Sequence, residues 1–307
     1  GAQAGAPNDV FANKDVQGVV IGVPNKFHKP LAVSALQAGK DVLVEKPMAM
    51  NVAEAKAMIA AAKKTRRLLQ IGFVHRYSTV GVAAKKLIDA GRVGNVYHLK
   101  ANYYRRRGIP GLGGWFTTKE MSGGGPMIDL GVHVIDLITY LVGQPKALRA
   151  SGKVYDYFGK DMKKYLYEGM WAGPPRYDGT FNVEDSAHAM VRLAPNITLE
   201  VNVTWAGNFP ADSVKDVMGI FGDKGGITFN LAGKELALAT EENGFNVDVK
   251  PNLKQLDAWD GQTNAFAEAI KTRKVAHADG ESGLYVQSIL DAIYKSSAAN
   301  KEVEIKA

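Results

Sequence analysis

The chain has 307 residues, of which 46% are hydrophobic and 22% charged, as is typical of a globular protein. It contains no cysteine, which excludes disulfides, thiolate catalysis and cysteine–metal sites. The net charge is +7, but the sequence has neither a nucleic-acid-binding motif nor an apolar run long enough to span a membrane. We therefore expect neither nucleic acid nor a membrane as a partner. This length predicts two domains.

The first quarter of the chain alternates short apolar runs with helical segments. Strands are predicted at residues 19–23, 41–45 and 68–73. Pro30 begins a helix that ends at Gly39, and Asn51 caps a second helix that extends to about Lys64. Such alternation predicts a parallel sheet covered on both faces.

After Tyr77 the pattern changes. The next predicted elements are a helix at 80–89, a strand at 96–105, a glycine-rich loop at 107–125 and a helix at 126–141. They are followed by strands at 147–157, 183–193, 197–205, 214–221, 227–229 and 236–239. These closely spaced strands predict a mostly antiparallel sheet. Residues 159–182 form a long insertion, a kind of loop that is often a functional lid, and helices at 262–271 and 281–299 end the pattern.

Helix 126–141 carries the strongest chemical pattern. Asp129, His133 and Asp136 are spaced so that a regular helix places them on one face. The helix is apolar nearly all round, which predicts burial, and buried charged groups usually have a task or a partner. A carboxylate beside an imidazole suits proton exchange with a substrate hydroxyl. The alternative, a pair that only stabilises an exposed helix face, fits the apolar flanks less well.

The predicted parallel strands end in polar residues that share one edge of the sheet, where ligands bind in open α/β sheets. Lys46, after the second strand, could donate a hydrogen bond to a substrate oxygen or act as an exposed turn residue. Asn25 and His28, after the first strand, could bind a ligand or cap the following helix. Arg76, after the third, is a candidate for a phosphate, a carboxylate or a sugar hydroxyl.

Further candidates lie before helix 126–141. Tyr104 and Arg107, at the end of the long strand, are assigned as substrate-binding residues together with Arg76, Asp129 and His133. Trp115, beside glycines, could stack on a flat ring or fill the core. No spacing of histidines and carboxylates suggests a metal site, and no motif suggests serine hydrolysis.

With these motifs in place, the chain resembles the Gfo/Idh/MocA oxidoreductases, a family named after glucose–fructose oxidoreductase, inositol dehydrogenase and a rhizopine-catabolism protein. Segments 20–28, 35–47, 123–136 and 279–297 carry the resemblance through their order and spacing. It implies an α/β fold: a Rossmann domain over 1–77, with its N-terminal part missing from the chain, and a second α/β domain over 78–307 with a large, mostly antiparallel open sheet. Helix 126–141 would lie at the junction between the two domains. The sheet would form the interface of a homo-oligomer, either a dimer or a tetramer.

The resemblance also implies a reaction, hydride transfer between NAD or NADP and a secondary alcohol or ketone of a sugar, inositol or glycoside. Lys46 would hydrogen-bond the reacting oxygen, Asp129 would orient the substrate or the lysine, and His133 would exchange the hydroxyl proton. The expected residues lining the nicotinamide riboside are Pro24, Asn25, His28, Glu45, Lys46 and Trp115. Two alternatives are an NAD-dependent glycosidase that acts by transient oxidation and elimination, and a non-catalytic sugar or dinucleotide sensor.

One departure concerns the start of the chain. The family begins with a strand, a Gly-x-Gly-x-x-Gly turn, a helix and a strand that ends in the residue selecting NAD or NADP. Residues 1–6 have no preceding strand and do not supply that turn. We therefore predict about 30 to 60 further residues before Gly1, the size of a βαβ unit. NAD and NADP both remain open, with NAD preferred, and a cytoplasmic location is the default expectation.

Overall fold

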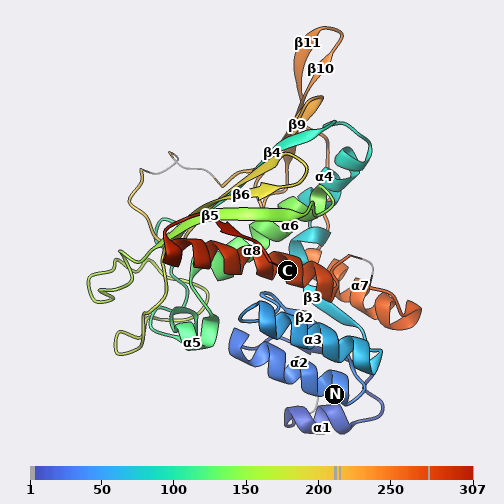
Figure 1. Ribbon diagram of the computed structural model, residues 1–307, viewed down its shortest axis with the longest axis vertical. Helices are drawn as coiled ribbons and strands as arrows, with labels where there is room; N and C mark the ends of the chain where they lie inside the picture. Colours follow the sequence, from blue (N-terminus) through green and yellow to red (C-terminus); the bar gives the residue numbers. More distant parts are fainter. Residues whose placement is uncertain (1–3, 211–212, 214–215, 276, 307) are drawn as a thin grey trace.

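The computed structural model describes residues 4–210, 213, 216–275 and 277–306. It contains a three-stranded sheet and a nine-stranded sheet, which form the two halves of the molecule (Figure 1). The smaller sheet is parallel and consists of β1 (Gly18–Ile21), β2 (Asp41–Glu45) and β3 (Leu69–Gly72), in that order. The expected alternation of strands and helices is confirmed. Of residues 1–6, discussed above for the missing glycine-rich turn, residues 1–3 lie outside the described part.

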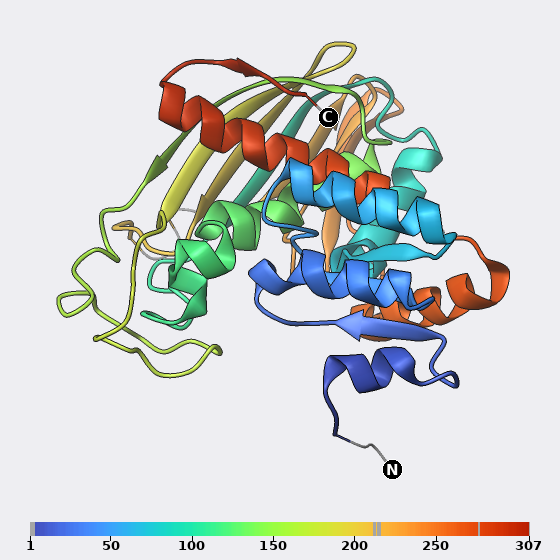
Figure 2. The same ribbon diagram turned by 60° about the horizontal axis from the view of Figure 1, so that its bottom comes forward.

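Helices cover both faces of this small sheet. Helices α2 (His28–Gln37) and α3 (Val52–Thr65) pack side by side over one face (Figure 2). Helix α7 (Ala258–Thr272) lies on the other, where a side chain at Gly18 would meet Ile270 of that helix at 2.7 Å. The Asn51 side chain caps α3 by accepting a hydrogen bond from the Glu54 amide, as its sequence predicts. Helix α1 (Pro7–Ala12), which the sequence analysis missed, precedes β1.

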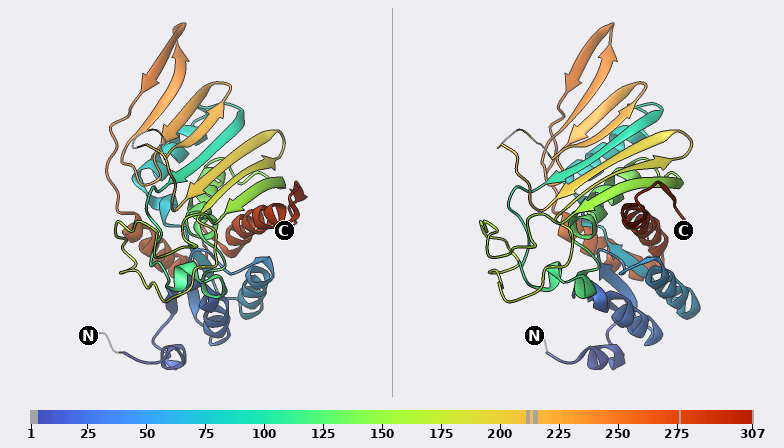
Figure 3. Two further views of the ribbon diagram at one scale, coloured as in Figure 1. Left: turned by 90° about the vertical axis from the view of Figure 1, so that its left-hand side faces the viewer. Right: turned by 60° about the vertical axis from the view of Figure 1, so that its left-hand side comes forward.

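The larger sheet has the strand order β11-β10-β9-β8-β4-β7-β6-β5-β12, and among the strand pairs described only β4–β7 is parallel. Its strands are β4 (Val96–Tyr104), β5 (Ala147–Tyr155), β6 (Ser186–Leu193), β7 (Ile197–Thr204), β8 (Met218–Gly222), β9 (Gly225–Phe229), β10 (Leu236–Glu242), β11 (Phe245–Val249) and β12 (Val303–Glu304). The mostly antiparallel open sheet is thus confirmed (Figure 3). β11 and β12 were not predicted. The strand predicted over 214–221 begins at Met218, and residues 214 and 215 lie outside the described ranges.

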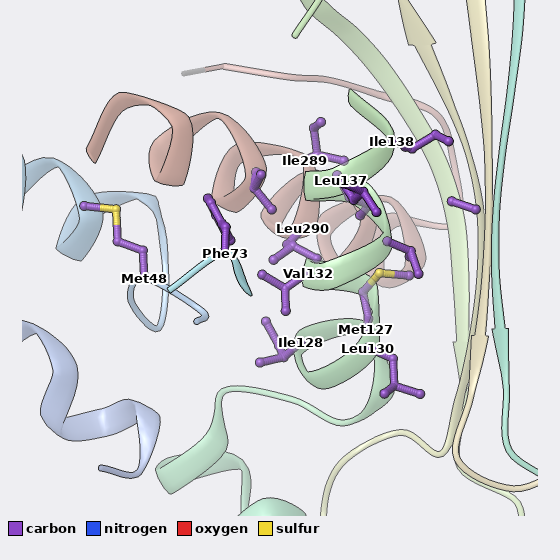
Figure 4. Packing of buried hydrophobic residues seen from close by; sticks show 14 of the residues in the cluster. Met48, Phe73, Met127, Ile128, Leu130, Val132, Leu137, Ile138, Ile289 and Leu290 are labelled. Atoms are coloured by element: carbon purple, nitrogen blue, oxygen red, sulfur yellow. The ribbon is translucent and has the colours of Figure 1, made fainter. Parts of the chain in front are cut away.

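The helix predicted over 126–141 lies where the two halves meet. It starts as a π-helical turn, Met127–Gly131, and continues as α6 (Val132–Leu141). Its apolar residues pack against Ile289 and Leu290 of α8 (Gly280–Ala299), and Met48 and Phe73 join the same core from the smaller sheet (Figure 4). The buried setting expected from its composition is therefore confirmed.

The remaining elements connect these layers. α4 (Thr79–Asp89) precedes β4, and the short α5 (Lys119–Ser122) interrupts the predicted glycine-rich loop. α8 contacts both α3 and β5, so the C-terminal helices pack on both halves, and the predicted domain boundary after residue 77 stays a prediction. Among the described residues, no helix has both the length and the apolar character needed to span a membrane.

Candidate active site

A cavity of about 590 Å³ opens where the carboxyl ends of β1, β2 and β3 face the π-helical turn. Both halves of the molecule contribute to its walls. Its polar lining residues include Asn25, Glu45, Lys46, His75, Arg105, Asp129 and His133. Its aromatic lining residues are Tyr103, Trp115, Phe116, Trp171 and Trp259. The cavity therefore lies at the sheet edge where the sequence predicted a ligand.

Lys46 and Asp129 meet across this junction. Lys46 directly follows β2, and its Nζ donates hydrogen bonds to Asp129 Oδ1 and to the Asp129 backbone oxygen, both at 3.1 Å. Asp129 Oδ2 accepts a hydrogen bond from Trp205 Nε1 at 3.0 Å and lies 3.7 Å from a guanidinium nitrogen of Arg105. Each oxygen of the carboxylate thus has a positively charged or donor partner.

These partners determine the charge of Asp129. Burial alone would raise its pKa, but Lys46, Arg105 and the Trp205 hydrogen bond together outweigh burial and hold the pKa below its usual value. Asp129 is therefore a carboxylate at neutral pH. The sequence had suggested neither Trp205 nor Arg105 as a partner, because nothing local links either residue to Asp129.

Two histidines face each other in the cavity. The rings of His75 and His133 meet edge to face, with centroids 4.8 Å apart. Burial, helped by the nearby charge of Lys46, lowers the pKa of His133 well below its usual value and that of His75 to about 4. Both imidazoles are therefore neutral at pH 7, and His133 can accept a proton there. His75 was not assigned a role from the sequence, although it follows β3 at the same sheet edge.

Asp136 does not line the cavity that Asp129 and His133 line. Its carboxylate binds Arg76, which donates from Nε at 3.1 Å and from a terminal nitrogen at 2.6 Å. A π-helical turn over Met127–Gly131, which holds more residues per turn than an α-helix, precedes α6, so the regular helical period does not apply over that turn. The structure corrects the assignment of Arg76 to substrate, since its buried guanidinium is paired with Asp136 and does not line the cavity.

Tyr104 and Arg107 also lie outside the cavity. The Tyr104 ring packs edge to face on Phe209, and Arg107 donates to the Gly207 carbonyl oxygen at 2.9 Å. Their neighbours Tyr103 and Arg105 line the cavity instead. Tyr104 ends β4 and points to the opposite face from Tyr103, whereas Arg107 lies beyond the strand, so the sequence located the right segment but not the residues that line the cavity.

The predicted cofactor-binding residues all line the cavity, namely Pro24, Asn25, His28, Glu45, Lys46 and Trp115. Both ring nitrogens of His28 are occupied by the backbone oxygens of Val23 and Pro47, at 2.8 and 2.7 Å, so His28 fixes two strand-end loops. Asn25 donates to the Ser122 carbonyl oxygen at 2.6 Å. These two side chains therefore shape the wall, and neither of them caps the following helix.

The polar residues at this sheet edge fit the nicotinamide and ribose half of a dinucleotide. Glu45 presents a carboxyl group at the end of β2, and Gly72 leaves room for it, since a Cβ there would lie 2.9 Å from that group. Burial raises the pKa of Glu45, against the opposing charge of Lys46. A carboxylate can accept hydrogen bonds from ribose hydroxyls. Within the described ranges, no group of three or more histidines and carboxylates is arranged to hold a metal ion.

Both halves of the chain match models of known protein families. Residues 4–73 match a family model described as an oxidoreductase family with an NAD-binding Rossmann fold, and residues 82–228 match a GFO/IDH/MocA C-terminal domain. D-Glucoside 3-dehydrogenase of Escherichia coli (strain K12) is 30% identical over 287 residues, which cover 92% of this chain and 77% of that protein.

Solved structures show the same architecture. Aldose–aldose oxidoreductase from Caulobacter crescentus, complexed with glycerol, superimposes with a TM-score of 0.79 at 25% identity, covering 97% of this chain and 82% of that one. Levoglucosan dehydrogenase in complex with NADH and levoglucosan gives a TM-score of 0.82 at 24% identity, covering 98% and 83%. These likenesses show that the chain shares the fold of these proteins over nearly its whole described length.

Proposed function

Because this chain belongs to the Gfo/Idh/MocA family of NAD-binding oxidoreductases, we propose that it transfers a hydride between a nicotinamide cofactor and a secondary alcohol or ketone of a sugar or glycoside. The cofactor is NAD or NADP. The observation that carries the proposal is the meeting of Lys46, Asp129 and His133 in one cavity, beside residues that fit a nicotinamide riboside.

Lys46 binds the reacting oxygen. An ammonium group has three N–H donors, and Asp129 takes two of them through its side chain and its backbone oxygen. The third can donate to the hydroxyl or carbonyl oxygen of a substrate. This contact strengthens as negative charge develops on that oxygen during oxidation, so Lys46 stabilises the transition state more than the bound alcohol.

His133 moves the proton. Its neutral imidazole can accept the hydroxyl proton as the alcohol becomes a ketone, and can return it in the opposite direction. Asp129 is charged and holds Lys46 in place, so the ammonium cannot turn away from the substrate. A bound nicotinamide would supply the hydride acceptor or donor at the carbon that carries this oxygen.

The test is turnover by the full-length protein with a panel of sugars, inositols and glycosides, followed through the absorbance of reduced nicotinamide. We expect turnover with at least one of them, and a loss of more than about 100-fold in kcat for Lys46→Ala. Unchanged activity in Lys46→Ala would contradict the proposed role. Cleavage of a glycoside without net change in the nicotinamide would replace the proposal with the glycosidase alternative, and ligand binding without turnover would favour the sensor.

We also propose that the outer face of the large sheet joins copies of the chain into a dimer or a tetramer. α6 and α8 pack on its inner face, and among the described elements no helix packs on the outer face (Figure 3). On the outer face His188 hydrogen-bonds Asn202 at 2.7 Å, and Asn202 donates to Asn102 at 3.0 Å. Tyr155 and the half-exposed Met190 flank this polar row. An ordered face that mixes aromatic, apolar and hydrogen-bonded groups is suited to self-association.

A further inference from the structure

The insertion at 159–182 brings an exposed tryptophan to the cavity. Trp171 lines the cavity although its side chain is 72% exposed. Its ring meets Phe116 edge to face at 5.3 Å, and Phe116 stacks on Trp115 at 3.8 Å. Trp115, Phe116 and Trp171 together form one aromatic wall. An exposed ring that extends a row of aromatic rings along the wall of a cavity points to a binding surface.

This wall is fixed in place. The insertion has neither helix nor strand, yet its backbone is bonded to the loop that carries Trp115 and Phe116. Arg176 N donates to the Leu112 oxygen at 2.7 Å, and Asn182 N donates to the Thr117 oxygen at 3.0 Å. The contact is so close that a Cβ at Gly113 would lie 1.9 Å from the Arg176 oxygen. Trp171 is therefore held relative to the cavity.

Hydrogen bonding within the insertion also restrains the segment around Trp171. The Tyr167 hydroxyl donates to the Gly173 carbonyl oxygen at 2.7 Å and so closes a short loop around Trp171. Ordering a loop of this kind before a ligand arrives reduces the entropy that binding must overcome. The insertion thus presents Trp171 as a prepared contact.

The Trp171 end of the wall lies outward of the reacting groups. The Lys46 and Asp129 side chains are 17% and 9% exposed, so they lie deep in the cavity, whereas Trp171 lies at its mouth. A sugar ring bound to Lys46 and His133 would fill the deep part. Whatever is attached to that sugar would extend along the aromatic wall. Indole rings favour flat apolar partners, including aromatic rings and the C–H face of a pyranose.

We propose that Trp171 and Phe116 form a subsite for the ring attached to the oxidised sugar. The substrate is then a glycoside whose second group is a ring with an apolar face, either an aromatic aglycone or a second pyranose. This inference rests on the proposed function, because it assigns the deep part of the cavity to the reacting sugar.

The test compares kcat/KM of the full-length protein for glucose, methyl glucoside, phenyl glucoside and cellobiose. We expect the wild type to favour phenyl glucoside or cellobiose over the methyl glycoside. Trp171→Ala should lose about tenfold in kcat/KM for the favoured glycoside, mainly through KM, equal to about 1.4 kcal/mol. It should leave glucose and methyl glucoside within about twofold, and Trp171→Phe should recover part of the loss.

Leu166→Ala is the matched control. Leu166 lies on the same insertion and is 62% exposed, but it does not line the cavity. We expect it to behave like the wild type with every substrate. An equal loss for all substrates in Trp171→Ala, or no loss for any, would overturn the subsite. Weaker NADH binding by Trp171→Ala, measured by fluorescence, would assign the wall to the cofactor and would also overturn it.

Failure of the proposed function has a different signature. If the wild type turns over no sugar or glycoside, the proposed reaction fails. The subsite is then judged by calorimetric binding of phenyl glucoside and cellobiose. Binding that weakens about tenfold in Trp171→Ala but not in Leu166→Ala supports the subsite, whereas no binding to the wild type, or unchanged binding by Trp171→Ala, overturns it.

Discussion

Lys46 Nζ lies 3.1 Å from Asp129 Oδ1, although 83 positions separate the two residues in the chain. One follows a strand of the smaller sheet, and the other belongs to the π-helical turn beside the larger sheet. Their contact therefore ties the reacting groups to the relative position of the two halves. A change that shifts either half would misplace the ammonium, and a displacement of about 1 Å can cost about 100-fold in rate.

Asp129→Asn tests this relationship directly. An amide oxygen can replace only one carboxylate oxygen, so one of Lys46 and Trp205 loses its acceptor, and Lys46 and Arg105 lose the charge between them. We expect kcat to fall roughly 100-fold with little change in the circular dichroism spectrum. Asp161→Asn, in an exposed ion pair, is the control. Wild-type kcat in Asp129→Asn would contradict the assigned role.

His133 should determine the acid limb of the pH profile for alcohol oxidation. Only the neutral imidazole accepts a proton, and the fraction of this form falls as pH drops through the pKa. Because burial and Lys46 lower that pKa well below 6.5, kcat should hold constant through pH 7 and decline only in more acidic solution. An acid limb centred above pH 6.5 in kcat would contradict this assignment.

His133→Asn should remove that limb. We expect kcat to fall by about 10² to 10⁴, the usual contribution of a positioned general base, with the remaining rate nearly independent of pH in the acid range. His98→Asn serves as the control, since the His98 ring stacks on Phe221 away from the cavity. If the limb survives in His133→Asn, another group accepts the proton.

The buried pair of Arg76 and Asp136 should contribute strongly to stability. Both side chains are nearly inaccessible, at 1% and 2% exposure, and three hydrogen bonds join them. Asp136→Asn leaves the guanidinium charge uncompensated, so we expect the free energy of unfolding in urea to fall by about 3 kcal/mol. Lys63→Gln breaks an exposed pair with Glu281 and should cost less than about 1 kcal/mol. Equal effects of the two substitutions would show that burial of the pair does not matter.

The sequence correctly predicted the elements whose bounds depend on a local pattern of residues. Strand 41–45 was predicted with the bounds that the structure gives, because Gly39 and Pro47 flank a short run of β-branched and apolar residues. The meeting of Lys46, Asp129 and His133 followed from family resemblance and from the rule that parallel strands end at one edge.

The errors came from non-local contacts and irregular turns. No residue near Arg76 in the sequence indicates that its guanidinium pairs with Asp136, 60 positions away, so the arginine was assigned to substrate. A regular helical period also could not anticipate the π-helical turn at the start of helix 126–141. Trp205 was predicted only as part of a strand, since its hydrogen bond to Asp129 depends on how the sheet meets that turn.

The glycines before the π-helical turn should resist substitution. A Cβ at Gly125 would lie 1.9 Å from the Glu184 backbone oxygen, and the backbone of the next residue, Asp185, is hydrogen-bonded to Tyr155 and Trp205 at the ends of the large sheet's strands. Glu184 also accepts hydrogen bonds from the Met127 amide and the Tyr294 hydroxyl, at 3.2 and 2.7 Å. Gly125→Ala should therefore displace the segment that carries Asp129, lowering both kcat and the urea midpoint.

Gly5→Ala controls for the cost of replacing a glycine, because its Cβ would approach Asp9 no closer than 3.4 Å. Tyr294→Phe separates the hydrogen bond from the steric effect, and its expected cost is about 1 kcal/mol. A Gly125→Ala variant with wild-type stability and kcat would show that the turn can shift without loss.

The outer face of the large sheet should determine the oligomeric state. In a two-fold interface the same patch meets itself, so a new charge near its centre faces a like charge on the partner. Met190 is 50% exposed and pairs across the strands with Ser151 and Glu200. A lysine at this position would therefore be exposed to solvent and lie beside the carboxylate of Glu200, so the isolated subunit should tolerate it. Met190→Lys should therefore reduce the particle mass from light scattering without lowering the urea midpoint. Leu166→Lys, on the insertion, should leave the mass unchanged, and an equal mass for Met190→Lys and the wild type would exclude this face as the interface.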